Sequence, residues 1–299
     1  MVRLLAFDDF RAHRKVLDSD DFALTDGEPD PPPRDLVSQE VWDGIMTLPD
    51  DVVIRTTSHL GEWVELLYDL WGGWINSLPR RSIVTQAMLD CADDFSAALF
   101  NLVHGYYKQA IAALRNALET MVLACECTLS GTVETWHEWQ DGKEIAFRKI
   151  LPKLAANSRF FELEVRVRSL TRGGLFPDAG NTDGPAWTRN LYQRLSNFSH
   201  ARGNSTNGAL WESTGPVYSE KGMRTACYLY LETYVLLVVL VKATLRRFRV
   251  PGASLHLFTM EHLQVFCPEP FPQVCEAYAT AVAIRRRRRR SVTATREVD

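Results

Sequence analysis

The most apolar stretch of the chain, residues 226–243, limits what the sequence can fold into. It reads ACYLYLETYVLLVVLVKA, so a helix made from it is apolar on nearly every side. Such a helix must lie in a membrane or be surrounded by other helices. The stretch contains Glu232 and is shorter than the ~20 residues of a membrane span. We therefore expect a buried helix over residues 223–248, covered by its own bundle or by a second chain.

The rest of the chain is also patterned for helices. Apolar side chains recur three and four residues apart, which is the spacing of one helix face. Helices are predicted over residues 2–17, 52–78, 81–104, 106–125, 144–156, 159–170, 186–200 and 272–284. Because strands do not alternate with these helices, the predicted fold class is all-α, an irregular helical bundle. Its core should include Leu99, Leu114, Leu118, Leu195, Phe198 and Leu236.

Glycine, proline and tryptophan give local signals. Gly105 should end the helix before it or kink it, whereas Gly184 and Pro185 suit the N-cap and first position of the helix that follows them. Residues 130–142 are expected to interrupt the helices, and residues 209–219 to form a small hairpin. Trp71 and Trp74 are three residues apart, as are Trp136 and Trp139. On a helix that spacing favours core packing over base stacking.

Charge is distributed unevenly along the chain. Residues 1–51 hold thirteen Asp/Glu against five Lys/Arg, a net of −8, whereas residues 285–299 hold seven Arg against two acids, a net of +5. We therefore expect three parts. Residues 1–50 form an acidic helix and a Pro-rich linker, residues 51–266 a helical domain, and residues 267–299 a short helix with a basic tail.

The tail contains an unbroken run of arginines: Arg285, Arg286, Arg287, Arg288, Arg289 and Arg290. Such a run repels itself and is expected to be disordered. It could attract RNA or another polyanion without sequence preference. It could equally be a solvated tail that aids solubility, and the sequence leaves both interpretations open.

Several enzyme classes lack their motifs here. HEWQD begins like a zinc-protease helix, but Asp141 stands where the second histidine is required, and neither a P-loop nor a nucleophile elbow is found. The six cysteines have no zinc-ligand spacing and are expected to be reduced, mostly buried thiols. No cofactor or metal is predicted. Because no secretory signal or membrane span is recognised, the expected location is the cytoplasm.

Four stretches together resemble the HEPN-like helical proteins. DDFSAALFNLVHGYYKQAIAALRNALE is similar to the opening helical pair of that group. WHEWQDGKEIAFRKILPKL, LYQRLSNFSHA and LWESTGPVYS are similar to later elements of one branch. The similarity covers roughly residues 85–245, and it implies an irregular HEPN-like bundle that forms a homodimer in a microbial cell.

The resemblance also implies an activity. Many HEPN proteins are metal-independent endoribonucleases or toxins, in which an arginine and a histidine four to six residues later line a cleft between two copies. Arg194 and His200 match this spacing. A neutral imidazole can take the proton of an RNA 2′-hydroxyl, and a guanidinium can hold the phosphate as charge builds. The expected substrate is RNA, cut in a stress or defence response.

Other polar residues could support this pair. Ser196 and Asn197 lie between its members, and Arg115 and Glu119 are one turn apart on an apolar helix. The latter two could orient His200 or the phosphate, or could be an ordinary surface pair worth about 0.2–0.5 kcal/mol. Glu232, inside the apolar helix, needs a partner or water.

The spacing of Arg194 and His200 imposes a geometric condition. Six residues along a straight helix rotate a side chain by ~600° and advance it by ~9 Å, so the two would face different sides. They converge only if the helix ends between them or if a second chain supplies one of them. Leu195 also stands where active nucleases often carry a polar residue. The alternative to a nuclease is a catalytically silent interaction or regulatory module.

Overall fold

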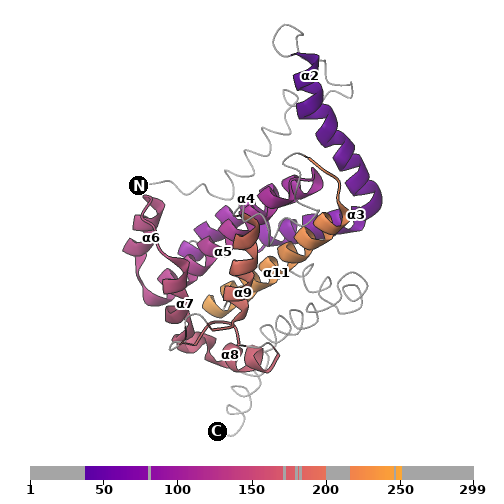
Figure 1. Ribbon diagram of the computed structural model, residues 1–299. Coiled ribbons are helices and arrows are strands. Elements are labelled where there is room, and N and C mark those ends of the chain that lie inside the picture. The colour runs from indigo at the N-terminus through magenta and orange to yellow at the C-terminus, as the bar shows by residue number, and fades with distance from the viewer. Residues whose placement is uncertain are drawn as a thin grey trace, which may run out of the picture. The chain divides into compact units, whose positions relative to one another are not determined.

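The computed structural model describes residues 38–79, 82–170, 173–178, 181, 184–199, 216–245 and 247–250. In these ranges the chain is all-α, which confirms the predicted fold class (Figure 1). No strand forms there, although an isolated antiparallel bridge joins Asp178 and Asn181. The chain divides into two units, Met1–Thr47 and Leu48–Asp299. In the first unit, the short helix α2 (Gln39–Trp42) continues into a π-helical turn, Asp43–Thr47.

The second unit contains eight α-helices in its described part. They are α3 (Leu48–Ile75), α4 (Ile83–Val103), α5 (Tyr107–Ser130), α6 (Val133–Gln140), α7 (Phe147–Ala155), α8 (Ser158–Leu170), α9 (Trp187–Ser199) and α11 (Glu220–Thr244). α3 is kinked at Leu60, where φ is −135° and ψ is 27°. α4 and α5 lie side by side as a helical hairpin (Figure 1).

Gly105 ends α4 as predicted. Its φ of 79° lies in the left-handed region that favours glycine. A Cβ at this position would lie only 2.4 Å from the carbonyl oxygen of Val217, so the backbone before α11 packs directly on the turn. The α4–α5 hairpin and the start of α11 are thus tied together at this end of the bundle.

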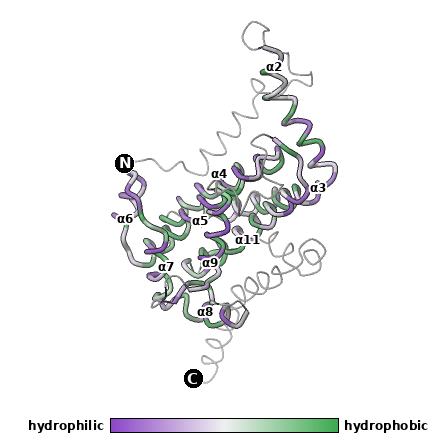
Figure 2. The backbone as a smooth tube through the Cα atoms, in the orientation of Figure 1, coloured by the Kyte–Doolittle hydropathy of each residue, from purple (hydrophilic) through white to green (hydrophobic). Residues whose placement is uncertain are grey.

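The apolar helix α11 lies in the core. It packs against α3, α4, α5, α8 and α9, and hydrophobic positions run along α5 and α11 in Figure 2. By length and composition α11 could cross a membrane, but 83% of its apolar window is buried inside the bundle. The predicted buried helix is therefore confirmed, and helices of the same chain supply its covering.

The predicted core is mostly correct. Leu114, Leu118, Leu195 and Leu236 are fully buried. Leu99 and Phe198 are only partly buried, although both pack against the core. These two side chains are therefore less buried than the other four.

Several predicted boundaries were wrong, and the cause is clear for three of them. Residues 130–142 include a helix, α6, which Trp136 anchors by burying its ring and donating from Nε1 to Gln86 Oε1 (2.9 Å). α9 begins at Trp187 rather than at Pro185, because the first helical N–H groups donate to the loop before it. α11 ends at Thr244, four residues early, since Leu245 is extended (φ −108°, ψ 93°).

Other expectations fall on residues that the structure does not describe. These are the helices over 2–17 and 272–284, the Pro-rich linker, His200, the arginine run and residues 209–215 of the hairpin. Residues 216–219, the remainder of that hairpin, form no strand.

Asp94 on α4 gives the bundle a pH dependence. Burial raises its pKa to about 6, reinforced by Asp90 and Asp93 and opposed by Asn116, which donates to both carboxylate oxygens at 3.0 Å. A pKa above the unfolded value of about 3.9 means that the folded protein binds this proton more tightly. The contribution to stability is complete below about pH 4 and is lost as the pH rises through about 6.

We therefore expect Asp94→Asn to be more stable than the wild type above pH 6, with the difference vanishing below about pH 4. These limits are the pKa of Asp94 in the folded protein, about 6, and in the unfolded chain, about 3.9. Urea unfolding of both proteins across this range measures the difference. Asp141→Asn, at the exposed C-cap of α6, is the matched control for removing one carboxylate from the surface. A variant that is less stable than the wild type at neutral pH would show that the ionised carboxylate is favoured instead.

Candidate functional site

α9 presents two polar faces, one on each side of its buried leucines. Leu191 and Leu195 point into the core. At 100° per residue, Arg194 and Tyr192 project in nearly opposite directions. The first reaches α11 and the second reaches α5. The residues predicted as one site are therefore divided between two faces.

The start of α9 is fixed by its own preceding loop. Trp187 N–H donates to Gly174 O (2.9 Å) and Thr188 N–H donates to Leu175 O (3.1 Å). The loop can approach this closely because Gly173 has a φ of 94° and no Cβ, which would otherwise overlap the carbonyl of Pro185. Backbone carbonyls of this loop thus accept hydrogen bonds from the first N–H groups of α9, as an N-cap side chain does in other helices.

The first face contains an ion pair between Arg194 and Glu232. The guanidinium Nη2 donates to Glu232 Oε1, and Trp187 Nε1 donates to the same oxygen at 2.9 Å. The carboxylate side chain is 3% exposed, whereas that of Arg194 is 40% exposed. The partner that the sequence requires for Glu232 is therefore the arginine of the predicted catalytic pair.

This pair has consequences for the charge of Arg194. A carboxylate in direct contact cancels much of the attraction that the guanidinium would exert on a phosphate. The exposed edge still offers donors to solvent, because one Nη2 hydrogen bond uses only part of the guanidinium. Removing the cation that pairs with a buried carboxylate is also costly for folding. Arg194 thus has a structural role, and its role in phosphate binding stays a prediction.

The second face contains Arg115 and Glu119 of α5 with Tyr192 of α9. Arg115 Nη2 donates to Glu119 Oε1 (3.0 Å) and to the Tyr192 hydroxyl (3.1 Å), and its guanidinium lies 5.3 Å from the centre of the tyrosine ring. Burial alone lowers the pKa of Arg115, but the hydrogen bond with Tyr192 and the charge of Glu119 outweigh it and raise that pKa. Arg115 is therefore a fixed cation, 25% exposed.

Two polar atoms of α5 and α9 have no hydrogen-bond partner in the described part of the chain. Arg115 Nε and Ser196 Oγ are both buried without a hydrogen bond there. Ser196 follows Tyr192 by one helical turn and shares its face, whereas Asn197 is exposed. Unsatisfied buried polar atoms are uncommon in folded proteins, so the hydrogen bonding between α5 and α9 is incomplete in the described part of the chain.

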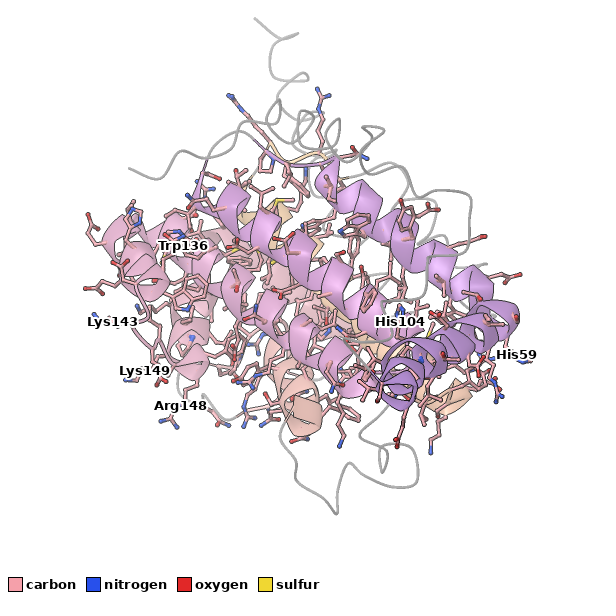
Figure 3. All side chains as sticks on the ribbon, turned by 90° about the horizontal axis from the view of Figure 1, so that it is seen from above. His59, His104, Trp136, Lys143, Arg148 and Lys149 are labelled. Carbon is pink, nitrogen blue, oxygen red and sulfur yellow. The ribbon has the colours of Figure 1, made fainter. Side chains whose placement is uncertain are left out.

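Cations of α7 continue this face. The ring of Phe147 stacks on Tyr192 at 4.1 Å and 15°, which places the start of α7 against the Arg115 network. The next two residues, Arg148 and Lys149, are exposed. Figure 3 shows them with Lys143 on one side of the bundle. The α5–α9 site, by which we mean Arg115, Glu119, Tyr192 and Ser196, is therefore adjacent to cationic side chains.

Metal and thiol chemistry find little support among the described residues. No group of three or more His, Cys, Asp or Glu there could hold a metal ion. The four described cysteines are buried and free of disulfides. Burial raises the pKa of Cys125 to about 12 and that of Cys127 to about 11. These two thiols are consequently poor nucleophiles at neutral pH.

Comparison with protein-family models, with curated proteins and with solved structures finds no match to this chain. The likeness to HEPN proteins rests on the sequence motifs alone.

Sequence reasoning missed Tyr192 as a member of the site. A signal was present, because Tyr192, Ser196 and His200 are spaced four residues apart, as on one face of a helix. The Arg-to-His spacing drew attention to Arg194 instead.

Proposed function

We propose that this protein is a HEPN-like, metal-independent endoribonuclease. Its RNA phosphate binds at the α5–α9 site, and His200 acts as general acid and base. The observation that supports it is the partly buried Arg115, held by Glu119 and Tyr192, with Ser196 one helical turn after Tyr192 on α9. His200, which lies outside the described residues, follows Ser196 by four positions in the sequence.

The proposed chemistry needs one base and one fixed cation. His200 takes the proton of the 2′-hydroxyl as that oxygen attacks the adjacent phosphate, and returns a proton to the departing 5′-oxygen. Arg115 stabilises the charge that builds on the phosphate, because its orientation is set before the RNA arrives. Arg194 remains the other candidate for this role, with Glu232 reducing its effective charge.

The surroundings favour a polyanionic substrate. Arg148 and Lys149 are exposed directly after Phe147, whose ring stacks on Tyr192. Exposed cations of this kind bind nucleic-acid backbones without reading the sequence and make binding sensitive to salt. The same face therefore combines an RNA-attracting rim with a fixed arginine.

The test is cleavage of mixed RNA in EDTA by the purified full-length protein. We expect the wild type to cut, and His200→Ala to lose at least ~100-fold in rate, the usual contribution of general acid–base catalysis. Arg115→Lys keeps the charge but not the guanidinium fork, so it should lose about tenfold or more. The matched control is Arg224→Ala, which removes an exposed arginine paired with Glu220 on α11 and should cut normally.

Three results would contradict the proposal. The wild-type protein could leave RNA intact, His200→Ala could retain full activity, or Arg115→Lys could cleave RNA as fast as the Arg224→Ala control. Thermal midpoints of every variant must be measured beside the rates, so that lost activity is not lost folding.

The second candidate is a catalytically silent helical module that binds a partner. The Arg194–Glu232 pair favours it specifically, because that pair explains the arginine of the motif without any chemistry. An intact RNA pool after incubation with well-folded wild-type protein is the result expected for this candidate.

A further inference from the structure

The second unit has a large pocket formed by other elements than the α5–α9 site. Its volume is about 1430 Å³, and it lies where α3 and α11 end and α4 begins. Small-molecule sites commonly span ~300–1,000 Å³, so the pocket has room for an extended ligand. Arg159, on α8, also lines the pocket.

The wall is cationic. Among the described residues that line the pocket are three arginines, Arg159, Arg247 and Arg249, and one carboxylate, Asp69. Within the described ranges, none of the three arginines forms an ion pair with an acidic side chain. Arg159 Nη1 donates to the carbonyl of Thr244 (2.6 Å) at the end of α11, and its other side-chain N–H groups form no hydrogen bond with the residues that the structure describes. The pocket wall therefore attracts anions.

The remaining wall combines flat and apolar surfaces with neutral polar groups. Tyr68 is 58% exposed, with its ring 5.5 Å from that of Trp71. Phe248 and Leu245 add apolar surface, and Asn76 adds an amide. An exposed aromatic ring beside arginines suits the stacking of a heterocyclic base next to its phosphates.

We infer that this pocket binds a nucleoside phosphate, with the phosphates on Arg247 and Arg249 and the base against Tyr68. This site goes beyond the proposed RNA cleavage and does not depend on it. Arg159 fixes the end of α11 and so shapes the pocket as well as contributing charge.

Calorimetric titration of the full-length protein with ATP at physiological ionic strength tests the inference, with adenosine and inorganic phosphate as partial probes. We expect saturable binding of ATP and weaker binding of both fragments. Arg247→Ala with Arg249→Ala should weaken ATP binding by tenfold or more, on the order of two lost charge-assisted hydrogen bonds. Tyr68→Ala should also weaken it, whereas Tyr68→Phe should not.

Two variants distinguish this pocket from the other cationic parts of the chain. Arg148→Ala with Lys149→Ala neutralises the rim of the α5–α9 site, and replacing the run Arg285 to Arg290 by glutamine neutralises the tail. Both should bind ATP like the wild type. Absence of ATP binding to the wild type would overturn the inference. So would full affinity in the Arg247→Ala/Arg249→Ala protein, or loss of affinity in either of the two neutralised variants.

Discussion

Replacing Arg194 by alanine is expected to lower the free energy of unfolding by about 2–3 kcal/mol. The physical reason is the partner that remains. Glu232 is buried, and its Oε2 already has no hydrogen bond in the described part of the chain, so only the indole of Trp187 would still hold the carboxylate. The value lies at the low end of the range for broken buried pairs, because Arg194 is partly in water. Urea unfolding at neutral pH measures it.

A second substitution isolates the cause. Glu232→Gln keeps an acceptor for Trp187 while removing the buried charge, so the double variant Arg194→Ala/Glu232→Gln should regain most of the lost stability. Arg224→Ala, which breaks an exposed arginine–glutamate pair, is the control and should cost less than ~0.5 kcal/mol. If Arg194→Ala is no less stable than this control, the pair with Glu232 does not stabilise the fold.

The same variants separate structure from catalysis at Arg194. If Arg194 holds the phosphate, Glu232→Gln frees its full charge and should preserve or increase RNA cleavage, whereas the double variant should lose it. If Arg194 serves only Glu232, cleavage by the double variant should match that of Glu232→Gln. Measuring cleavage by Arg194→Ala alone cannot make this distinction, because its loss of activity would be mixed with its loss of stability.

The helical periodicity was sufficient to predict the fold class and the main helices. Leucines such as Leu114 and Leu118 recur on one face of their helix, and an apolar face of this kind can be read from the local sequence and is usually buried. Helix ends were predicted less well, because side chains from distant elements decide them. Nothing in the sequence spacing indicates a role for Arg159, yet its guanidinium donates to the carbonyl of Thr244, 85 positions away, at the end of α11.

The candidate site shows the same limit. The sequence required a partner for Glu232 and left Arg194 with two interpretations, but a contact across 38 positions is a tertiary fact that no local pattern encodes. The link between Arg115 and Tyr192, 77 positions apart, is of the same kind. Sequence spacing can show that residues share a helix face, but which helix that face meets depends on how the bundle packs.

Trp74→Ala should destabilise the protein more than any other substitution considered, by about 4–5 kcal/mol. The ring of Trp74 is fully buried between α4 and α11, with edge contacts to Phe95 (5.5 Å, 77°) and Tyr234 (5.7 Å, 61°). Its Nε1 donates to Met88 O at 2.8 Å. Alanine removes both the ring and this bond, and the surrounding aromatic rings cannot close the cavity without leaving their own positions.

Two companion variants test whether the cavity is the cause. Trp74→Phe keeps most of the ring but not the N–H group, so it should cost roughly 1–3 kcal/mol, near the value of one unmade buried hydrogen bond with a smaller void. Trp139→Ala removes a partly buried tryptophan that contacts Trp136 at 5.0 Å, and it should cost less than Trp74→Ala. Because whole domains are stable by only ~5–15 kcal/mol, Trp74→Ala should lower the urea midpoint strongly or prevent folding. A midpoint close to that of Trp139→Ala would show that Trp74 is no more important to the core, and its indole would again be a candidate for stacking on a ligand.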